Sequence, residues 1–456
     1  MLALPVGTST GKHPAAMILL LNAVAIGASA AAQPASHARA GGAEGSLALS
    51  VESVVRVAES RFNRADPVAT SFPATNPDDA LVLCGSNADD LLMISTDGGR
   101  AFERHVQWVN GHVSSSLPHI QDIGNNLVGE GNWRRTTRGR GVPQGYQTGP
   151  IRGPWTTNRT GIVTADRAAR NVTFHTDETL STQAHWSAPP HELVMFSLGA
   201  GGVTPLDRTG RNFLATAALR YGTQGLPGKD HRGHCCNNSV VAYATTDGGK
   251  HWTYRSTIAS KESVNAAGWP SLEGPNENDV VLLADNVTIF SVIRKDGGDG
   301  YPSHPHVPYL LAKSTDGGVR WTIREAPHTM MSARPRMVAL SNGALVVAGG
   351  RPALNLWVSL DSGETFSTYD IPTLHNQNMK NSEDRFCDAF EDANMSLGWA
   401  ESSCYTQVLA LSDDRAMICY ERQGRGSGGY NHIQPKGCDP ANATLYCMRI
   451  QVERSL

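Results

Sequence analysis

A turn pattern that occurs four times constrains this sequence more than any other feature. It reads Ser or Thr, any residue, Asp, any residue, Gly, two further residues and then Phe or Trp. Each copy follows a short apolar run, so each is predicted to be a tight turn between two β-strands. The Asp can accept hydrogen bonds from the turn backbone, and Gly adopts the positive φ that such turns require. The copies lie at residues 95–102, 245–252, 314–321 and 359–366.

Four copies of one turn indicate a repeat architecture rather than a set of unrelated hairpins. Short β-type runs separate the copies, and no long apolar pattern has the 3.6-residue period of a helix. We therefore predict an all-β fold, a six-bladed β-propeller, in which radial repetition leaves only short sheet edges. A set of β-sandwiches is the alternative, but a turn that recurs at one place in each unit favours the propeller.

The boundaries of the predicted units follow from the same runs. The first unit is expected over residues 51–113, and the last over runs at 405–411, 416–421 and 445–452. Residues 114–190 are irregular, and we interpret them as an insertion or a degenerate blade. Asp177 and Trp186 would then be remnants of an eroded turn. Residues 51–456 as a whole are predicted to form a single propeller domain.

The N-terminus has the pattern of a targeting segment. Lys12 and His13 precede an apolar, Ala-rich run that ends in small residues suited to signal cleavage. We expect a signal peptide at residues 1–32, or alternatively a signal anchor, and then a flexible lead-in at 33–50. The protein is therefore expected to be secreted or extracellular, or else to enter a lysosomal or other endomembrane lumen. No later stretch is long and apolar enough to span a membrane.

Cysteine content and net charge narrow the classes of function. The eight cysteines are an even number, which predicts disulfides but not their pairing. Six Asn-x-Ser/Thr sequons are typical of a secreted glycoprotein. No Cys and His cluster has the spacing of a zinc site, so neither a metal nor a cofactor is expected. The formal net charge of −3 argues against binding to nucleic acid or to an anionic membrane.

The residue types of the turns are explained by hairpin geometry, so we expect the chemistry to lie between the copies, near the starts of strands. Three segments there resemble the sialidases, the exo-acting neuraminidases whose six-bladed propellers carry Asp-box turns. The resemblance covers roughly residues 200–425 together with the first turn. Its three segments are 277–294, 351–359 and 404–421.

The resemblance implies catalytic roles at the first and third segments. Tyr405, before a predicted strand, would be the nucleophile, and Glu277 would be the base that activates it. Glu273 is a nearby competitor for the role of base. Glu421, at the end of the strand that returns after Tyr405, would orient an arginine of the substrate clamp.

The resemblance also implies a cluster of arginines. Arg294 and Arg351 would bind the carboxylate of a sialic acid, because a guanidinium group holds a carboxylate in a planar, two-pronged fork. Arg334 and Arg336 are alternatives to Arg351 within the same blade. The substrate carboxylate would repel an anionic nucleophile, and a phenol assisted by a neighbouring Glu avoids that repulsion. This is why sialidases depart from the two-carboxylate scheme of most glycosidases.

One place departs from the family pattern. The family's first clamp arginine should lie near Gly202, where this chain has no arginine. Arg220 resembles a second arginine near the substrate. Asp230 lies in the loop where the family keeps its acid, although Asp207 is nearby. Another arginine could fill the space at Gly202, or the substrate could differ.

The sequence therefore predicts an exo-α-sialidase-like glycoside hydrolase. It would remove terminal sialic or related nonulosonic acids from glycoconjugates with retention of configuration, so its partners would be sialylated or other acidic glycoconjugates. The alternative is a propeller without catalytic activity that binds a glycan or a protein. The missing arginine near Gly202 motivates this alternative.

Overall fold

The structure is a computed structural model of the chain. It describes residues 47–61, 65, 67–86, 91–104, 120–123, 126–129, 147–151, 155–158, 162–166, 171–175, 183–189, 193–197, 201–207, 211–221, 238–269, 271, 274–295, 307–350, 354–386, 405–423 and 442–454. All of them belong to one compact unit, Leu47–Leu456. The expected signal peptide and most of the expected lead-in lie outside the described residues.

The described strands form six sheets, and each sheet contains four strands that we call one blade. Blade I consists of β2 (Pro67–Phe72), β3 (Leu81–Ser86), β4 (Leu91–Ser95) and β5 (Glu103–Arg104). Blade II consists of β6 (Ile120–Ile123), β7 (Asn126–Gly129), β10 (Ile162–Asp166) and β11 (Asn171–His175). Blade III consists of β14 (Val203–Pro205), β15 (Phe213–Tyr221), β16 (Asn238–Thr245) and β17 (His251–Ser260). Blade IV consists of β18 (Asn278–Leu282), β19 (Ile289–Ile293), β20 (Leu310–Ser314) and β21 (Thr322–Glu325). Blade V consists of β22 (Arg336–Ala339), β23 (Leu345–Gly349), β24 (Asn355–Ser359) and β25 (Ser367–Asp370). Blade VI consists of β26 (Gln407–Ala410), β27 (Arg415–Arg422), β28 (Thr444–Arg454) and β1 (Leu47–Glu59).

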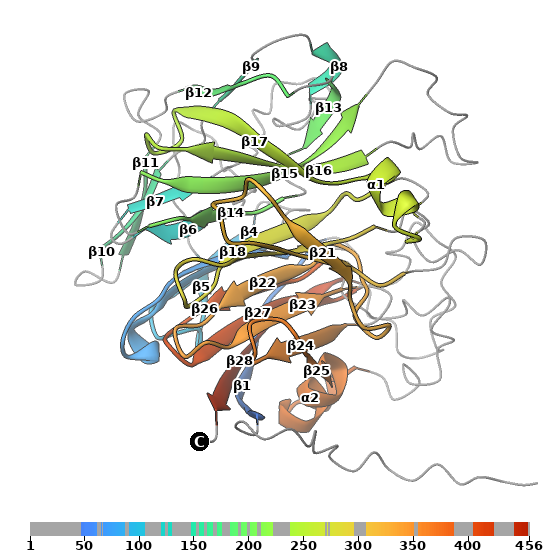
Figure 1. The fold of residues 1–456 in the computed structure, drawn as a ribbon. Coiled ribbons are helices and arrows are strands. Elements are labelled where there is room, and N and C mark those ends of the chain that lie inside the picture. The colour runs from blue at the N-terminus through green and yellow to red at the C-terminus, as the bar shows by residue number, and fades with distance from the viewer. Residues whose placement is uncertain are drawn as a thin grey trace, which may run out of the picture. The chain divides into compact units, whose positions relative to one another are not determined.

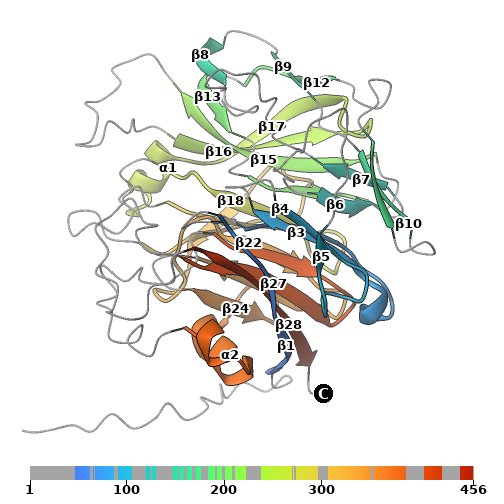
Figure 2. The same cartoon turned by 180° about the vertical axis from the view of Figure 1, so that it is seen from behind.

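The first strand of each blade contacts the first strand of its neighbours, and these contacts close a ring. They run from β2 to β6, β14, β18, β22 and β26, and from β26 back to β2. A closed ring of six inner strands, each followed outward by three further strands, is a six-bladed β-propeller. The predicted fold class is therefore confirmed. Successive blades lie side by side in the views of Figures 1 and 2.

The two ends of the described chain close the ring. The N-terminal strand β1 pairs antiparallel with the C-terminal strand β28 and forms the outermost strand of blade VI (Figure 1). The expectation that the first unit begins at residue 51 was wrong in this respect, because β1 begins at Leu47 and belongs to the last blade. Blade I begins only at Pro67. A pattern of β-type residues predicts a strand but cannot identify its partner, which here lies about 400 residues further along the chain.

A buried arginine on β28 contacts both β1 and blade I at this closure. The side chain of Arg449, on β28, is 1% exposed and contacts Glu52 on β1 at 2.8 Å. Its Nη1 also donates to the carboxylate of Asp78 at 2.9 Å and to the carbonyl oxygen of Gly98 at 3.1 Å. Asp78 lies in the 3-10 helix η1 (Pro77–Asp79), and Gly98 lies in the turn of blade I. One guanidinium group thus joins the N-terminal strand, blade VI and blade I.

The four repeated turns share one set of hydrogen bonds, and each joins the third and fourth strands of its blade. In the copy at 314–321, the Ser314 hydroxyl oxygen accepts from the amide of Gly318 at 2.9 Å. The Asp316 carboxylate accepts from the amides of Val319 and Arg320 at 3.1 and 2.9 Å. The other three copies repeat these bonds. Blade VI has no copy because β1 and β28 are not joined by a hairpin.

The irregular segment 114–190 contributes blade II and extends blade III. The strands β8 (Gln147–Ile151) and β9 (Trp155–Asn158) come between the second and third strands of blade II, yet pair within the sheet of blade III. There they join β13 (Leu193–Ser197) and β12 (Gln183–Trp186). Trp186 on β12 is buried and stacks on Trp252 with ring centroids 5.0 Å apart. It is therefore a core residue of blade III. Asp177 lies outside the described residues, so the interpretation of Asp177 and Trp186 as remnants of a turn stays a prediction.

The described part of the chain has two α-helices. α1 (Lys261–Ala266) is capped by Ser260, and α2 (Ile371–Asn378) by Asp370. α2 packs beside β25 and β1, as both ribbon views show. Among the described residues, no helix is long and apolar enough to cross a membrane.

A buried histidine fastens α2 to blade VI. His375 is completely buried, and its Nδ1 lies 2.7 Å from the Tyr420 hydroxyl. Its Nε2 lies 2.9 Å from the carbonyl oxygen of Asp384, in the 3-10 helix η3 (Ser382–Asp384). Since a carbonyl oxygen can only accept, Nε2 carries the proton and Nδ1 accepts from the tyrosine. This arrangement requires the neutral imidazole.

Replacing His375 with Gln should reduce the loss of stability in acid. Burial lowers the pKa of folded His375 to about 4, whereas an exposed imidazole has a pKa of about 6.5. As the pH falls, the unfolded chain therefore binds this proton first, and stability is lost between these two values. The loss is about 3 kcal/mol at most. Urea unfolding of both proteins across this pH interval measures it, and equal pH slopes of the unfolding free energy would contradict the assignment.

Candidate functional site

The candidate residues that precede inner strands lie at one end of the ring. Each blade repeats the same strand order, so the inner strands run in the same direction and their first residues lie at the same end. Glu277 immediately precedes β18, Arg334 lies two residues before β22, and Tyr405 lies two residues before β26. Blades IV, V and VI thus each bring one of these residues to this end.

Glu277 and Arg294 form a cross-strand ion pair in blade IV. They flank the first pair of the β18–β19 ladder, Asn278 and Ile293, so the hairpin places them opposite each other. The amide of Arg294 donates to the carbonyl oxygen of Glu277 at 2.8 Å. The Arg294 Nη1 lies 2.7 Å from the Glu277 Oε2, with side chains that are 6% and 17% exposed. Sequence reasoning selected both residues, and the hairpin between them explains their contact.

Arg334 links this pair to Tyr405. The backbone amide of Arg334 donates to the Glu277 Oε2 at 2.9 Å. The guanidinium carbon of the same residue lies 5.1 Å from the centroid of the Tyr405 ring. This distance is within the range of a cation–π interaction. The described contacts therefore run from Arg294 through Glu277 and Arg334 to Tyr405.

Arg336 lies where the sequence suggested a missing arginine. It is 2% exposed, and its Nη1 donates to the carbonyl oxygens of Gly201 and Asn278 at 3.2 and 3.3 Å. A Cβ atom on Gly202 would lie 2.0 Å from the Asp279 carboxylate. The space beside Gly202, where the resemblance would place the family's first clamp arginine, is therefore filled by the neighbouring blade. Another arginine approaches from blade V instead.

Asp279 is a site residue that sequence reasoning missed. Its carboxylate accepts from the amides of Val280 and Met337, each at 2.9 Å, and lies 3.8 Å from the Arg336 Nη1. Burial raises the pKa of the Asp279 carboxyl, and Arg336 opposes that shift. Burial also lowers the pKa of Arg336, to about 9, so the guanidinium remains charged at neutral pH. The available signal was an acidic residue at the start of an otherwise apolar strand.

Glu421 faces the start of blade I. It is completely buried near the end of β27, and Gln407 on β26 pairs with Cys419, so by register Glu421 lies opposite Tyr405. Its Oε2 accepts from the amide of Ala65 at 2.5 Å. Glu421 therefore connects the Tyr405 side of blade VI to the segment that precedes β2.

The remaining candidates lie outside this series of contacts or outside the described residues. Asp230, Glu273 and Arg351 lie outside the described residues. Arg220 is on β15, where its backbone pairs with Met195 and Asn238. The Asp207 side chain contacts Asn212. The roles assigned to these residues stay predictions.

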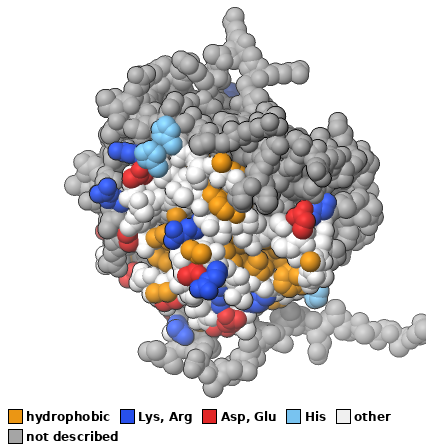
Figure 3. Space-filling view, turned by 45° about the horizontal axis from the view of Figure 1, so that its top comes forward, with side chains coloured by type: hydrophobic (Ala, Val, Ile, Leu, Met, Phe, Trp, Pro, Cys, Tyr) orange, Lys and Arg blue, Asp and Glu red, His pale blue; other side chains and the backbone are white. Residues whose placement is uncertain are grey.

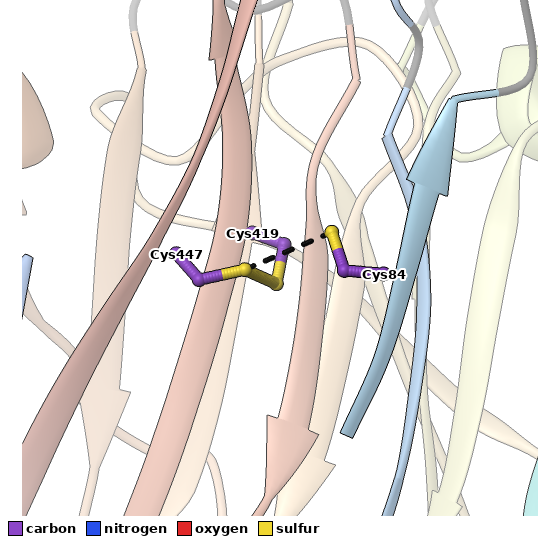
Figure 4. Close-up of side chains that lie close together, drawn as sticks. All are labelled: Cys84, Cys419 and Cys447. Atoms are coloured by element: carbon purple, nitrogen blue, oxygen red, sulfur yellow. Dashed lines mark hydrogen bonds between the residues drawn. A yellow bond between two sulfur atoms is a disulfide. The ribbon is translucent and has the colours of Figure 1, made fainter. Parts of the chain in front are cut away.

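Within the described part of the chain, one group of Cys, His, Asp and Glu residues is close enough to hold a metal ion. It consists of Cys84, Cys419 and Cys447, whose sulfur atoms lie within 4.8 Å of one another (Figure 4). Cys419 and Cys447 form a disulfide, however, so Cys84 is the one free thiol of these three residues. The group offers one thiol in this state and does not provide a set of metal ligands.

The surface shows no field of one charge sign over the described residues drawn in Figure 3, where acidic and basic side chains lie near one another. This agrees with the small net charge of the chain. The arginines of the candidate site are instead largely buried, with Arg294 5% and Arg336 2% exposed. Local pairing, rather than a surface-wide field, would govern what the site binds.

Comparisons with known proteins give structural likenesses only. No protein-family model and no curated protein matches the chain. Among solved structures it is similar to the α-L-arabinofuranosidase Arb93A of Fusarium graminearum, with a TM-score of 0.48, 12% identity and coverage of 89% of this chain and 98% of that one. The Hadza microbial sialidase Hz136 has a TM-score of 0.47, 12% identity and coverages of 86% and 66%. Trypanosoma rangeli sialidase has a TM-score of 0.44, 13% identity and coverages of 88% and 58%.

The chain spans about two thirds of the first of these sialidases and less of the second. Structural similarity at these TM-scores and identities does not indicate an activity. The function therefore has to be argued from the candidate site itself.

Removing one member of the Glu277–Arg294 pair should destabilise the protein more than removing both. Glu277→Ala leaves a nearly buried guanidinium without its carboxylate, which typically costs about 3 kcal/mol. Arg294→Leu in the same chain removes that charge, so the double variant should recover part of the loss. Urea unfolding of the two single variants and the double variant gives the coupling energy. Strictly additive losses would mean that the ion pair contributes nothing.

Proposed function

We propose that the protein is a retaining exo-α-sialidase-like glycoside hydrolase that removes terminal sialic or related nonulosonic acids from glycoconjugates. The observation that carries the proposal is the series of contacts from Arg294 through Glu277 and Arg334 to Tyr405. It brings a carboxylate, two arginines and a phenol, from three blades, to one end of the ring. This combination suits a sugar that carries its own carboxylate.

Each group then has one task. Tyr405 attacks the anomeric carbon and forms a covalent glycosyl intermediate, while Glu277 takes the phenol proton. Arg294 and Arg351 bind the substrate carboxylate, and Arg220 is proposed as a further arginine that contacts the substrate. Asp230 gives a proton to the leaving oxygen. Water then releases the sugar with its original configuration.

The residue before Ala65 in the sequence is a further candidate for the substrate clamp. Glu421 is proposed to orient a clamp arginine, and it accepts a hydrogen bond from the amide of Ala65. The preceding residue in the sequence is Arg64. Arg64 lies outside the described residues, and we propose it as a third clamp arginine because it is the direct neighbour of Ala65 in the sequence.

The setting of the enzyme follows from the N-terminal pattern. The proposed signal peptide would direct it to the exterior or to an endomembrane lumen, where sialylated glycoconjugates are available. A second function, binding of acidic glycans without turnover, has one observation in its favour. Two arginines of this end, Arg294 and Arg336, are already engaged by protein groups.

Hydrolysis of a fluorogenic sialoside tests the proposal. The wild type should release the fluorophore, and Tyr405→Phe should lower kcat by a factor of at least about 100, because the nucleophile is lost. Tyr369→Phe is the matched control, since Tyr369 lies on β25, the outer strand of blade V. It should keep wild-type activity.

Two results would reject the enzymatic assignment. One is an inactive wild type, and the other is full activity in Tyr405→Phe. Measurable affinity for free sialic acid, together with no hydrolysis of the sialoside, would instead support a binding protein.

A further inference from the structure

Arg334 acts on two of the proposed catalytic groups through two different parts of one residue. Its backbone amide binds the Glu277 Oε2, which also receives the Arg294 Nη1. Its guanidinium lies over the ring of Tyr405. A displacement of Arg334 would therefore move the base and the nucleophile relative to each other.

The backbone of Arg334 is held in a conformation that side chains disfavour. Its φ is 41°, in the left-handed region, where a Cβ atom crowds the backbone. The surrounding structure maintains this conformation. Ser332 donates to the carbonyl oxygen of Ala333 and contacts the Tyr309 hydroxyl, and Arg336 anchors the start of β22 to blades III and IV. Such conformations persist where neighbours fix them, and they occur often at functional sites.

We propose that Arg334 is a positioning residue that couples Glu277 to Tyr405. The left-handed backbone directs the amide to the carboxylate of blade IV while the guanidinium covers the phenol of blade VI. The cation above the ring holds its orientation, and it attracts the ring more strongly when the phenol loses its proton. This role rests on the proposed function for its kinetic consequence, but the contact itself does not depend on any activity.

Two substitutions separate the two parts of the residue. Arg334→Gly keeps the amide and relieves the unfavourable φ, so it removes only the guanidinium. Arg334→Lys keeps a cation that can lie over the ring. With the sialoside, Arg334→Gly should lower kcat roughly tenfold with a smaller change in KM, and Arg334→Lys should recover part of that loss.

A second measurement does not require turnover. The ring resonances of labelled tyrosine, with that of Tyr405 assigned by its absence in Tyr405→Phe, should shift in Arg334→Gly and return toward the wild type in Arg334→Lys. An unchanged Tyr405 resonance in Arg334→Gly overturns the proposal. If the wild type does not cleave the sialoside, the proposed function fails, while this resonance still decides whether Arg334 positions Tyr405.

A separate inference comes from the three cysteines between blades I and VI. The thiol sulfur of Cys84, on β3, lies 3.7 Å from the sulfur of Cys447 on β28. Cys447 is bonded to Cys419, its direct partner on the neighbouring strand. Figure 4 shows the three sulfur atoms turned toward one another. They lie in an apolar cluster shared by the two blades.

We infer that these cysteines form one exchanging set with a second disulfide state. All three sulfur atoms lie within 4.8 Å of one another, so the Cys84 sulfur lies to the side of the Cys419–Cys447 bond and the strands must first shift. The Cys84 thiolate then attacks the Cys447 sulfur in line with that bond, the bond from Cys447 to Cys419 breaks, and Cys419 leaves as a thiolate that takes up the proton. No external oxidant or reductant is consumed. The new bridge would span 363 residues instead of 28, and would join the first blade to the last. Burial raises the pKa of Cys84 to about 12, so the exchange should be slow in the folded protein.

Peptide mapping without reduction tests this inference. In the full chain with Cys419→Ala, oxidation by glutathione disulfide should yield a peptide that links Cys84 to Cys447, and should raise Tm above that of the same variant kept reduced. Cys84→Ala is the control, in which the Cys419–Cys447 peptide should form alone. If Cys84 and Cys447 stay unlinked in Cys419→Ala after unfolding and refolding with the oxidant, the inference is wrong.

Discussion

The closure of the ring by β1 and β28 is the contact on which the rest of the structure depends. A propeller is stable only when its last blade meets its first, because an open ring would expose the apolar faces that the first and last sheets pack against each other. Here the N-terminal strand completes blade VI, and Arg449 joins that strand to blades VI and I. A buried guanidinium is stabilised only while its partners are in place. The closure and the ion network therefore support each other.

The candidate site inherits its geometry from this ring. Glu277, Arg334 and Tyr405 come from three successive blades, so their separation is set by the packing between inner strands. Arg336 and Asp279 fix part of that packing, since they join blades III, IV and V through buried charges and backbone groups. Glu421 extends the connection to the segment before blade I. Glu277 and Tyr405 thus each contact Arg334 of a neighbouring blade as well as residues of their own blade.

Local patterns predicted much of the fold. The four turns have the expected hydrogen bonds because Ser or Thr, Asp and Gly at that spacing satisfy the turn backbone without help from distant residues. The contact between Glu277 and Arg294 was equally accessible, since one hairpin joins them. Asp279 was missed because its partners, Met337 and Arg336, lie in another blade. The blade assignment of residues 51–59 failed for the same reason, as their partner strand is at the opposite end of the chain.

By itself, the sequence determined the repeated turn and the all-β propeller that it indicates, because these follow from short-range spacing. Only the tertiary structure decided which strand closes the ring, what fills the space beside Gly202, and which arginine links Glu277 to Tyr405. These depend on the close approach of separate blades, where the space beside one strand is already filled by side chains of the next.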